Sequence, residues 1–405
     1  MSQPNVSRFM EQLLDEVEVE WKALGDVTKI KTGASVSKRM IENNPGEYPV
    51  INSGREPLGF IDEYNTENDP IGITTRGAGV GSITWQTGKY YRGNLNYSVT
   101  VNEKNSLNTR YLYHLLLSMQ SGIHALCTFQ GIPALNASNL KGFEIPIPCP
   151  DNPEKSLEIQ AEIVRILDAF TAMTAELTAE LNLRKKQYNY YRDQLLSFEE
   201  GEVEWKTLGE VAEYSKSRIS HTELDGSNYV GVESLLQNRA GKIDSTRTPD
   251  SGNLTQYSSG DILIGNIRPY LKKIWHADRI GGTNGDVLVV HPTDITISSR
   301  YLYQVLADDK FFEYNMQHAK GAKMPRGNKP KIMEYLVPIP YPDDVEKSLK
   351  EQARIVAILD KFDALTNSIT EGLPREIELR QQQYEYYRDL LLSFPKPEAD
   401  AAVST

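Results

Sequence analysis

Basic and amide side chains gather beside aromatic and glycine residues in two parts of the chain. Arginine, asparagine and glutamine can hydrogen-bond base edges through two atoms at once, whereas lysine and tyrosine suit phosphate groups. A single stretch of this kind is commonly a solvated basic loop, but its presence in two corresponding places favours binding. We predict a DNA-binding surface in each part, made in the first by Arg76, Lys89, Tyr90, Tyr91, Arg92, Asn94, Asn96, Gln130, Asn136 and Asn139, and in the second by Asn266, Arg268, Tyr270, Lys272, Lys273, Lys320, Lys323, Arg326, Asn328, Lys329 and Lys331.

Motifs for other chemistry are incomplete. "RGAGVGS" at 76–82 lacks the Lys-Ser/Thr of a P-loop, and Ser82 stands where a dinucleotide fingerprint needs glycine, so a tight turn between strands is expected. "PDNPEK" and "PDDVEK" resemble fragments of a nuclease motif, but their adjacent acid and lysine would point to opposite faces of a strand. The six histidines and two cysteines show no metal-ligand spacing. The chain is therefore expected to be non-catalytic and to hold no metal or cofactor.

The totals fit a chain of two or three domains with cores of their own. It has 405 residues, 39% of them hydrophobic, and a net charge of −11. The sequence contains neither a signal-peptide pattern nor a long apolar run, so a cytoplasmic protein is expected. The acidic charge is uneven, because residues 22–150 and 206–342 each carry a net charge of +2. Each of these parts can present a basic face to DNA.

The sequence contains an internal duplication. "VEWKALGDV" at 19–27 returns as "VEWKTLGEV" at 203–211, and "RYLYHLL" at 110–116 returns as "RYLYQVL" at 300–306. The segment from "IPIPCPDNPEKSL" at 145 returns 192 residues later as "VPIPYPDDVEKSL", and "YNYYRDQLLSF" at 188–198 returns as "YEYYRDLLLSF" at 384–394. Two similar halves related by a pseudo-twofold axis follow from this order.

Each repeat ends in a long helix. Apolar residues recur at helical spacing from Ser156 to Ser197, a length of roughly 63 Å, and this span contains "TAELTAEL" at 174–181. The second helix is expected to start near Ser348, with Glu351 completing a capping box, and "EGLPRE" at 371–376 should break or kink it. A lobe of this size does not need so long a helix, so we expect the two helices to pair as an antiparallel coiled coil.

The predicted fold class is mixed α/β: two globular lobes separated by these helices. Strands are expected in "ITTRGAGVGSITW" (73–85) and "GDILIGNIRPYLKKIW" (260–275), and a short helix in each "RYLY" segment. The predicted divisions are a helical stub (1–19), a first lobe (20–150), a spacer helix (151–200), a second lobe (201–342), a second spacer helix (343–394) and a tail (395–405).

These motifs resemble the DNA specificity subunits of type I restriction–modification systems, and "TAELTAEL" is similar to the repeat of one subgroup. The resemblance covers nearly the whole chain. It implies two target-recognition domains, each reading half of a split, asymmetric site in double-stranded DNA, and helices that bind two modification (methyltransferase) subunits, which restriction subunits can join. It also places S-adenosylmethionine on the modification subunit and ATP and Mg²⁺ on the restriction subunit. The apolar helix faces assigned to partner binding contain Ile163, Leu167, Phe170, Leu177 and Leu181, and Ile355, Leu359 and Phe362.

Two other functions are open to the sequence. A coiled-coil adaptor whose lobes bind proteins would leave DNA without a footprint, and a self-contained DNA methyltransferase would retain S-adenosylmethionine by itself. The missing cofactor motif argues against the second, and the paired basic stretches argue against the first.

Overall fold

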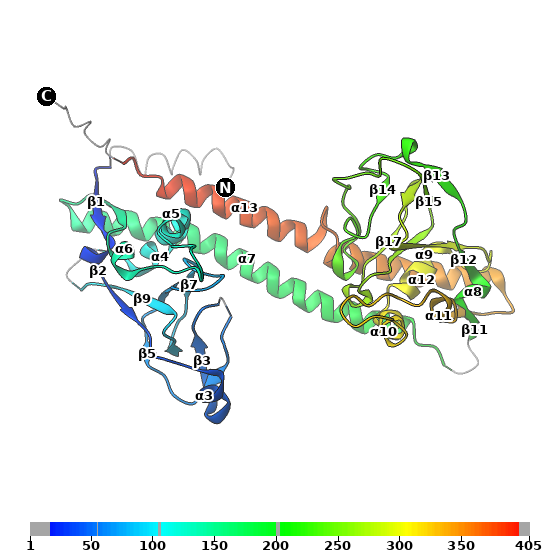
Figure 1. The fold of residues 1–405 in the computed structure, drawn as a ribbon, viewed down its shortest axis with the longest axis horizontal. Coiled ribbons are helices and arrows are strands. Elements are labelled where there is room, and N and C mark those ends of the chain that lie inside the picture. The colour runs from blue at the N-terminus through cyan, green and yellow to red at the C-terminus, as the bar shows by residue number, and fades with distance from the viewer. Residues whose placement is uncertain (1–16, 55, 104–106, 200–202, 397–405) are drawn as a thin grey trace. The chain divides into compact units, whose positions relative to one another are not determined.

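The computed structural model describes residues 17–54, 56–103, 107–199 and 203–396. It divides into two compact units, Met1–Met173 with Arg380–Thr405, and Thr174–Leu379, and each unit holds one lobe and segments of the long helices (Figure 1). Most of the predicted stub at 1–19 and of the tail at 395–405 lies outside the described residues. No helix in the described ranges has the length and apolar character needed to cross a membrane.

The first lobe contains two four-stranded sheets and one two-stranded sheet. The strand orders are β2-β9-β6-β7, β4-β3-β8-β5 and β1-β10. The strands are β1 (Val19–Ala23), β2 (Thr28–Thr32), β3 (Pro45–Ile51), β4 (Phe60–Ile61), β5 (Thr66–Glu67), β6 (Ile71–Thr74), β7 (Ile83–Trp85), β8 (Lys89–Arg92), β9 (Asn96–Val101) and β10 (Glu144–Pro148). The helices are α2 (Leu24–Val27), α3 (Lys38–Asn43), α4 (Thr109–Ser118), α5 (Gln120–Ala125) and α6 (Ala137–Lys141).

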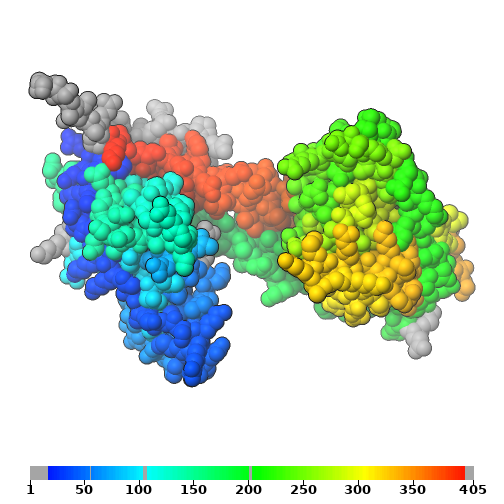
Figure 2. All heavy atoms as spheres, in the orientation of Figure 1, coloured from blue at the N-terminus to red at the C-terminus, as the bar shows by residue number. Residues whose placement is uncertain are grey.

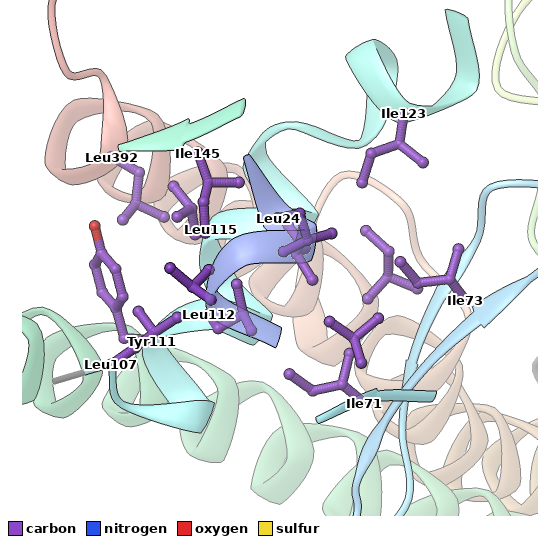
Figure 3. Packing of buried hydrophobic residues seen from close by; sticks show 14 of the residues in the cluster. Leu24, Ile71, Ile73, Leu107, Tyr111, Leu112, Leu115, Ile123, Ile145 and Leu392 are labelled. Carbon is purple, nitrogen blue, oxygen red and sulfur yellow. The ribbon is translucent and has the colours of Figure 1, made fainter. Parts of the chain in front are cut away.

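The core of this unit forms where strand β6 and helix α4 meet. All four residues of β6 are buried, as its short apolar run predicts for a central strand. Asn108 caps α4 by accepting from the Arg110 and Tyr111 amides, and the apolar face of α4 then buries Leu112 and Leu115. Figure 3 shows these leucines among Leu24, Ile73 and Leu392, residues that are far apart in the sequence.

The second lobe repeats this plan. Its sheets have the orders β12-β19-β16-β17, β13-β15-β18-β14 and β11-β20. The strands are β11 (Val203–Thr207), β12 (Ala212–Tyr214), β13 (Arg218–Ser220), β14 (Tyr229–Val230), β15 (Asn253–Tyr257), β16 (Ile262–Gly265), β17 (Ile274–His276), β18 (Gly281–Thr283), β19 (Val287–Pro292) and β20 (Leu336–Pro340). The helices are α8 (Leu208–Val211), α9 (Ser299–Leu306), α10 (Asp309–Gln317) and α11 (Lys329–Met333), with 3₁₀ turns η1 (His221–Glu223), η2 (Gln237–Arg239) and η3 (Pro269–Leu271).

The repeated motifs at the two ends of each lobe pair with one another. The Glu-Trp strand β1 is antiparallel to the Ile-Pro-Ile-Pro strand β10, with Trp21 opposite Pro146. In the second lobe β11 and β20 pair in the same register, with Trp205 opposite Pro338. The two motifs that open and close each repeat in the sequence therefore tie its ends together, which confirms the predicted duplication.

The first spacer helix is α7 (Pro153–Leu195), 43 residues without a break, close to the predicted span. α7 leaves the first lobe, whereas the last helix, α13 (Gly372–Leu392), ends in that lobe with Leu392 in its core, so the two run antiparallel there. Phe170 of α7 stacks on Tyr387 of α13, with ring centroids 5.1 Å apart. In the second unit Tyr188 of α7 stacks on Phe362, which belongs to α12 (Val345–Thr366).

The second helix starts earlier than predicted. Asp344 caps α12 by accepting from the Lys347 amide, so the predicted start at Ser348 with a Glu351 capping box is wrong. Ser348 instead lies buried inside the helix, where its hydroxyl accepts from Gln352. The predicted break is confirmed, because α12 ends at Thr366 and α13 begins at Gly372 with a φ of +76°. A Cβ at Gly372 would overlap the Ala364 carbonyl oxygen, so only glycine fits this turn.

Candidate DNA interface

The two lobes carry matching hairpins near the ends of their repeats. In hairpin 1 (residues 128–136) the Thr128 and Ala134 amides donate to each other's carbonyls over 2.8 and 3.0 Å. In hairpin 2 (residues 320–328) Lys320 and Arg326 exchange the same pair of bonds over 2.9 Å. In both hairpins the bonded residues are six positions apart, and each residue of hairpin 2 lies 192 positions after its counterpart in hairpin 1. The same backbone frame therefore carries two different sets of side chains.

Each hairpin rests on the loop that follows the central buried strand of its lobe. In the first lobe the Gly77 amide donates to the Pro133 carbonyl over 2.9 Å, and the Leu135 amide donates to the Thr75 carbonyl over 2.8 Å. The corresponding bonds in the second lobe run from Arg268 to Pro325 (2.7 Å) and from Gly327 to Asn266 (3.0 Å). The hairpin and the loop after β6 or β16 therefore form one surface in each lobe.

In the first lobe Arg76 belongs to the loop after β6, and the exposed Gln130 belongs to hairpin 1, which bonds that loop. Arg76 is next to both Thr75 and Gly77, and its backbone forms a bridge with Ala134 of hairpin 1. The Thr75 amide donates to the Leu95 carbonyl, which places the exposed Asn94 at the same edge. Asn136 caps α6 by accepting from the Ser138 amide, and the Asn139 amide group reaches the Leu126 carbonyl over 3.5 Å. Both asparagines are exposed but have structural partners.

Four predicted contact residues of the first lobe point inwards, so we withdraw them from the interface. They are Tyr90, Tyr91, Arg92 and Asn96. The Arg92 guanidinium donates to the Ile71 and Tyr97 carbonyls over 3.1 Å and to the Asp69 carbonyl over 2.6 Å, and also to Asn96. Burial is the largest influence on this guanidinium and lowers its pKa. Arg92 therefore ties strands together inside the lobe, where it bonds Tyr90 and Asn96, and Tyr91 packs in a separate apolar cluster.

Lys89 lies at the far end of strand β8 from Asn94. Its ammonium group sits 4.6 Å from the centre of the Tyr64 ring, and hydrogen bonding to Tyr64 is the main cause that raises its pKa. Lys89 is exposed, but it does not belong to the surface formed by hairpin 1 and the loop after β6.

In the second lobe the exposed members of the predicted set gather on hairpin 2 and the loop after β16. They are Arg268, Tyr270, Lys320, Lys323, Arg326 and Lys329. Arg268 has a φ of +53°, and the Arg326 guanidinium lies 3.1 Å from the Asp286 carboxylate. The yellow-to-orange part of the chain, which includes hairpin 2, covers much of the visible face of this unit in Figure 2.

Other predicted residues of this lobe have structural partners instead. Asn266 is buried, the Lys272 ammonium lies 2.9 Å from Asp309, and the Lys273 ammonium donates to the Val232 carbonyl over 2.6 Å. Desolvation lowers the pKa of Lys273. Lys331 of α11 pairs with Glu334, the residue that follows this helix, and Asn328 is the half-buried residue that precedes it. Asn266, Lys272 and Lys273 are therefore corrected to structural roles.

The sequence-based set missed the apolar residues at the hairpin tips. Phe129 and Ile132 in hairpin 1 are 54% and 67% exposed, and Met324, which matches Ile132 in register, is 49% exposed. The constant offset of 192 residues could have identified them, because it aligns "GIP" with "KMP" at the two turns.

The glycine-rich stretch at 76–82 is the turn between β6 and β7, as predicted. The Thr74 amide donates to the Ser82 carbonyl over 2.9 Å, and the Gly81 amide donates back to Thr74. Gly77 and Gly81 both have positive φ. This stretch therefore closes a hairpin. Among the described residues there is no cluster of three or more His, Cys, Asp or Glu that could hold a metal ion.

Four of the eight predicted partner-binding helix residues face their own lobes. Ile163 and Leu167 belong to the first core, and Ile355 and Leu359 to the second, all fully buried. They fasten the helices to the lobes, so they are corrected from a partner-binding to a structural role. Phe170 and Phe362 stack on tyrosines of neighbouring helices, and Leu177 and Leu181 are half-buried.

A different pair of helix residues repeats on the surface. Tyr190 and Tyr386 occupy the same place in "YNYYRD" and "YEYYRD", and each is 61% exposed. The tyrosines two positions earlier in each motif, Tyr188 and Tyr384, are buried. The repeated motif therefore presents one tyrosine inwards and one outwards in both halves.

Known proteins resemble the chain over almost its full length. The family model of the type I restriction modification DNA specificity domain matches residues 16–184 and again residues 200–379. A type I restriction enzyme specificity subunit of Escherichia coli is 38% identical, with 96% of this chain and 98% of that protein covered. A putative type I specificity subunit of Haemophilus influenzae is 32% identical, with 96% and 99% covered.

A solved structure shares the fold. The S subunit of a type I restriction–modification system from M. genitalium matches with a TM-score of 0.63 at 18% identity, covering 94% of this chain and 98% of that chain. The duplicated lobes, the paired hairpins and the two family matches agree with one another. The chain belongs to the family of type I restriction–modification DNA specificity subunits.

Proposed function

We propose that each lobe reads one half of a bipartite, asymmetric DNA site through its hairpin and the loop beneath it. The observation that carries this proposal is the duplicated frame: identical backbone bonds hold hairpins 1 and 2, while their side chains differ. Two copies of one frame with different side chains would present different groups to DNA at corresponding positions, so the two lobes would recognise different sequences. Membership of the specificity family supplies the general function, which is DNA sequence specificity without catalysis by this chain.

The long helices recruit two modification subunits in this proposal. Tyr190 and Tyr386 support it, because an exposed tyrosine in the same motif at each helix gives one kind of partner two similar docking places. The break between Thr366 and Gly372 exists in the second helix only, so the two docking faces differ in detail. Restriction subunits join the complex, S-adenosylmethionine belongs to the modification subunit, and ATP and Mg²⁺ belong to the restriction subunit.

Mapping of methylated bases tests the proposal. Cells that express this chain with its modification subunit should carry methylation at a single split sequence, with two defined half-sites and a spacer of fixed length. The matched control expresses the modification subunit without this chain and should show no such pattern. Methylation that does not depend on this chain would refute the proposed function.

A double substitution separates the helix part of the proposal from the DNA part. Tyr190→Ala with Tyr386→Ala removes both exposed tyrosines and leaves the buried Tyr188 and Tyr384 in place. The variant should bind fewer modification subunits in sedimentation or mass measurements of the complex. Full retention of two subunits at wild-type affinity would assign the docking surface elsewhere on the helices.

A further inference from the structure

The two hairpins differ sharply in charge at matched positions. Hairpin 1 reads "TFQGIPALN" and contains no charged side chain. Hairpin 2 reads "KGAKMPRGN" and contains Lys320, Lys323 and Arg326 without an acidic residue. Because backbone bonds place both segments in the same way, the difference lies in what they present.

The cations of hairpin 2 are available to a ligand. Lys320 and Lys323 are exposed and form no ion pair with any residue in the described ranges. Arg326 pairs with Asp286, yet its side chain is still 56% exposed. Arg76 lies beside hairpin 1 and Arg268 lies beside hairpin 2, so each lobe has one such arginine. The difference in charge between the two hairpins therefore remains.

Hairpin 1 presents apolar and amide groups in place of these charges. Phe129 contacts the His124 ring with centroids 5.0 Å apart, yet more than half of its side chain is exposed. Ile132 and Gln130 flank Gly131 at the turn, where φ is +87°. Exposed apolar side chains beside an amide suit the edges of bases, including the thymine methyl group, and they do not attract phosphate.

We propose that the two lobes bind DNA by different physical means. Hairpin 2 holds the phosphate backbone through Lys320 and Lys323, and hairpin 1 contacts base edges through Phe129, Gln130 and Ile132. This division rests on the proposed function, in which both hairpins face DNA. Of the two hairpins, it assigns the counterion release, and therefore the contribution to binding unrelated DNA, to hairpin 2.

The test uses the full chain in complex with its modification subunits. Affinity is measured between about 50 and about 200 mM salt on a duplex with the mapped site and on a duplex with both half-sites scrambled. Lys320→Thr with Lys323→Ala removes two cations and gives position 320 the residue that occupies position 128 in the first repeat. The matched variant, Phe129→Ser with Ile132→Ser, removes the apolar tip.

The lysine variant should weaken binding to both duplexes. The slope of log affinity against log salt should become shallower by about 0.9 for each lost phosphate contact, or about 1.8 for the pair. The apolar variant should lose about tenfold in affinity or more on the mapped site, with an unchanged slope and no loss on the scrambled duplex.

A reciprocal variant keeps the proposal testable if either of these fails to fold. Thr128→Lys with Ala134→Arg gives hairpin 1 the counterparts of Lys320 and Arg326, at positions with negative φ, and should steepen the salt slope by a similar amount. An unchanged slope in the lysine variant, or an equal loss of slope in the apolar variant, overturns the proposed division. A wild-type complex that does not prefer the mapped site argues against the proposed function itself.

Discussion

At the scale of single residues, a matched polar joint fastens each lobe to the long helices. Arg110 pairs with Asp168 of α7 over 2.8 Å, and Arg300 pairs with Asp360 of α12 over 2.9 Å. The next turn of the lobe helix differs, because His114 bonds Asp168 in the first unit and Gln304 bonds Asp360 in the second. The joint is therefore duplicated, but a histidine bonds the aspartate in the first copy and a glutamine bonds it in the second.

This difference predicts that the first joint adds a pH dependence of its own through His114. His114 is fully buried between Asp168 and the Tyr384 hydroxyl, and burial, with smaller contributions from Arg110 and Arg388, lowers its pKa against the raising effect of Asp168. Because the pKa of His114 is lower in the folded chain than in the unfolded chain, the unfolded chain binds the proton more readily, and stability falls as pH drops below about 6.5.

His114→Gln copies the second joint and should remove that loss. The melting temperature of wild type should drop more than that of the variant between about pH 7.5 and about pH 5.5. His276, whose pKa burial lowers to about 4, is present in both proteins and cancels in the comparison. Equal drops would mean that His114 does not control stability in this range.

Arg268→Ala tests base reading in the second lobe. Arg268 is exposed and its backbone is held by the Pro325 carbonyl of hairpin 2, so the loss of its side chain should leave the loop in place. A base-reading arginine contributes about 1–3 kcal/mol, and we expect only the half-site read by residues 206–342 to relax or weaken. Equal losses on every sequence, with a shallower salt slope, would reassign Arg268 to a phosphate.

Residue type alone could not separate Arg268 from Arg92. Both sit beside asparagine, aromatic and glycine residues in the sequence, but Arg92 lies on a strand whose side chains turn into the lobe. The charge of Arg92 is satisfied by carbonyls that its own sequence neighbourhood does not contain, including those of Ile71 and Asp69. Assigning such residues requires the pairing of distant strands, which local patterns do not determine.

At the scale of elements, repetition in the sequence predicted most of what the structure shows. The long helix, its pairing and the break after Thr366 follow from apolar periodicity and from Gly372. The predicted start of α12 at Ser348 is wrong because the helix is capped one turn earlier, by Asp344. Periodicity also led us to assign Ile163 and Leu167 to a partner, although their own lobe buries them. An apolar stripe indicates that a face is covered, but it does not say by what.

The repeated word "TAELTAEL" lies within the unbroken helix α7, and Leu177 and Leu181 are its half-buried positions. A third TAEL after Leu181 adds about 6 Å of helix and a net rotation of about 40°. One base pair of B-DNA advances about 3.4 Å and rotates about 35°. We therefore expect an active variant with both half-sites unchanged and a spacer longer by one base pair. The rotation matches one base pair closely, and the excess rise is small enough for bending to absorb. A lobe rotated out of its groove, by contrast, would lose its base contacts.

Sequencing of methylated sites in cells that carry the insertion measures this spacer. The control is an insertion of two residues, which rotates the helix by about 200° and should abolish site-specific methylation. An unchanged spacer in the three-repeat variant would show that the TAEL repeats do not set the distance between the half-sites.

At the scale of the whole molecule, each half of the chain is closed by its own ends. Lys22 and Ile145 are register partners in the β1–β10 pair, and Lys206 and Val337 are partners in β11–β20. A lobe can therefore be cut at two residues that lie opposite each other, which leaves the paired strand ends and the helices in place. Because of this closure, exchanging one lobe can test directly whether each lobe independently reads one half-site.

That experiment exchanges residues 22–145 for the first lobe of another family member and maps methylated bases in cells that carry the same modification subunit. One half-site should change to the donor's, while the other half-site and the spacer length stay as in wild type. A change in both half-sites, or in neither, would show that the lobes do not read the half-sites independently.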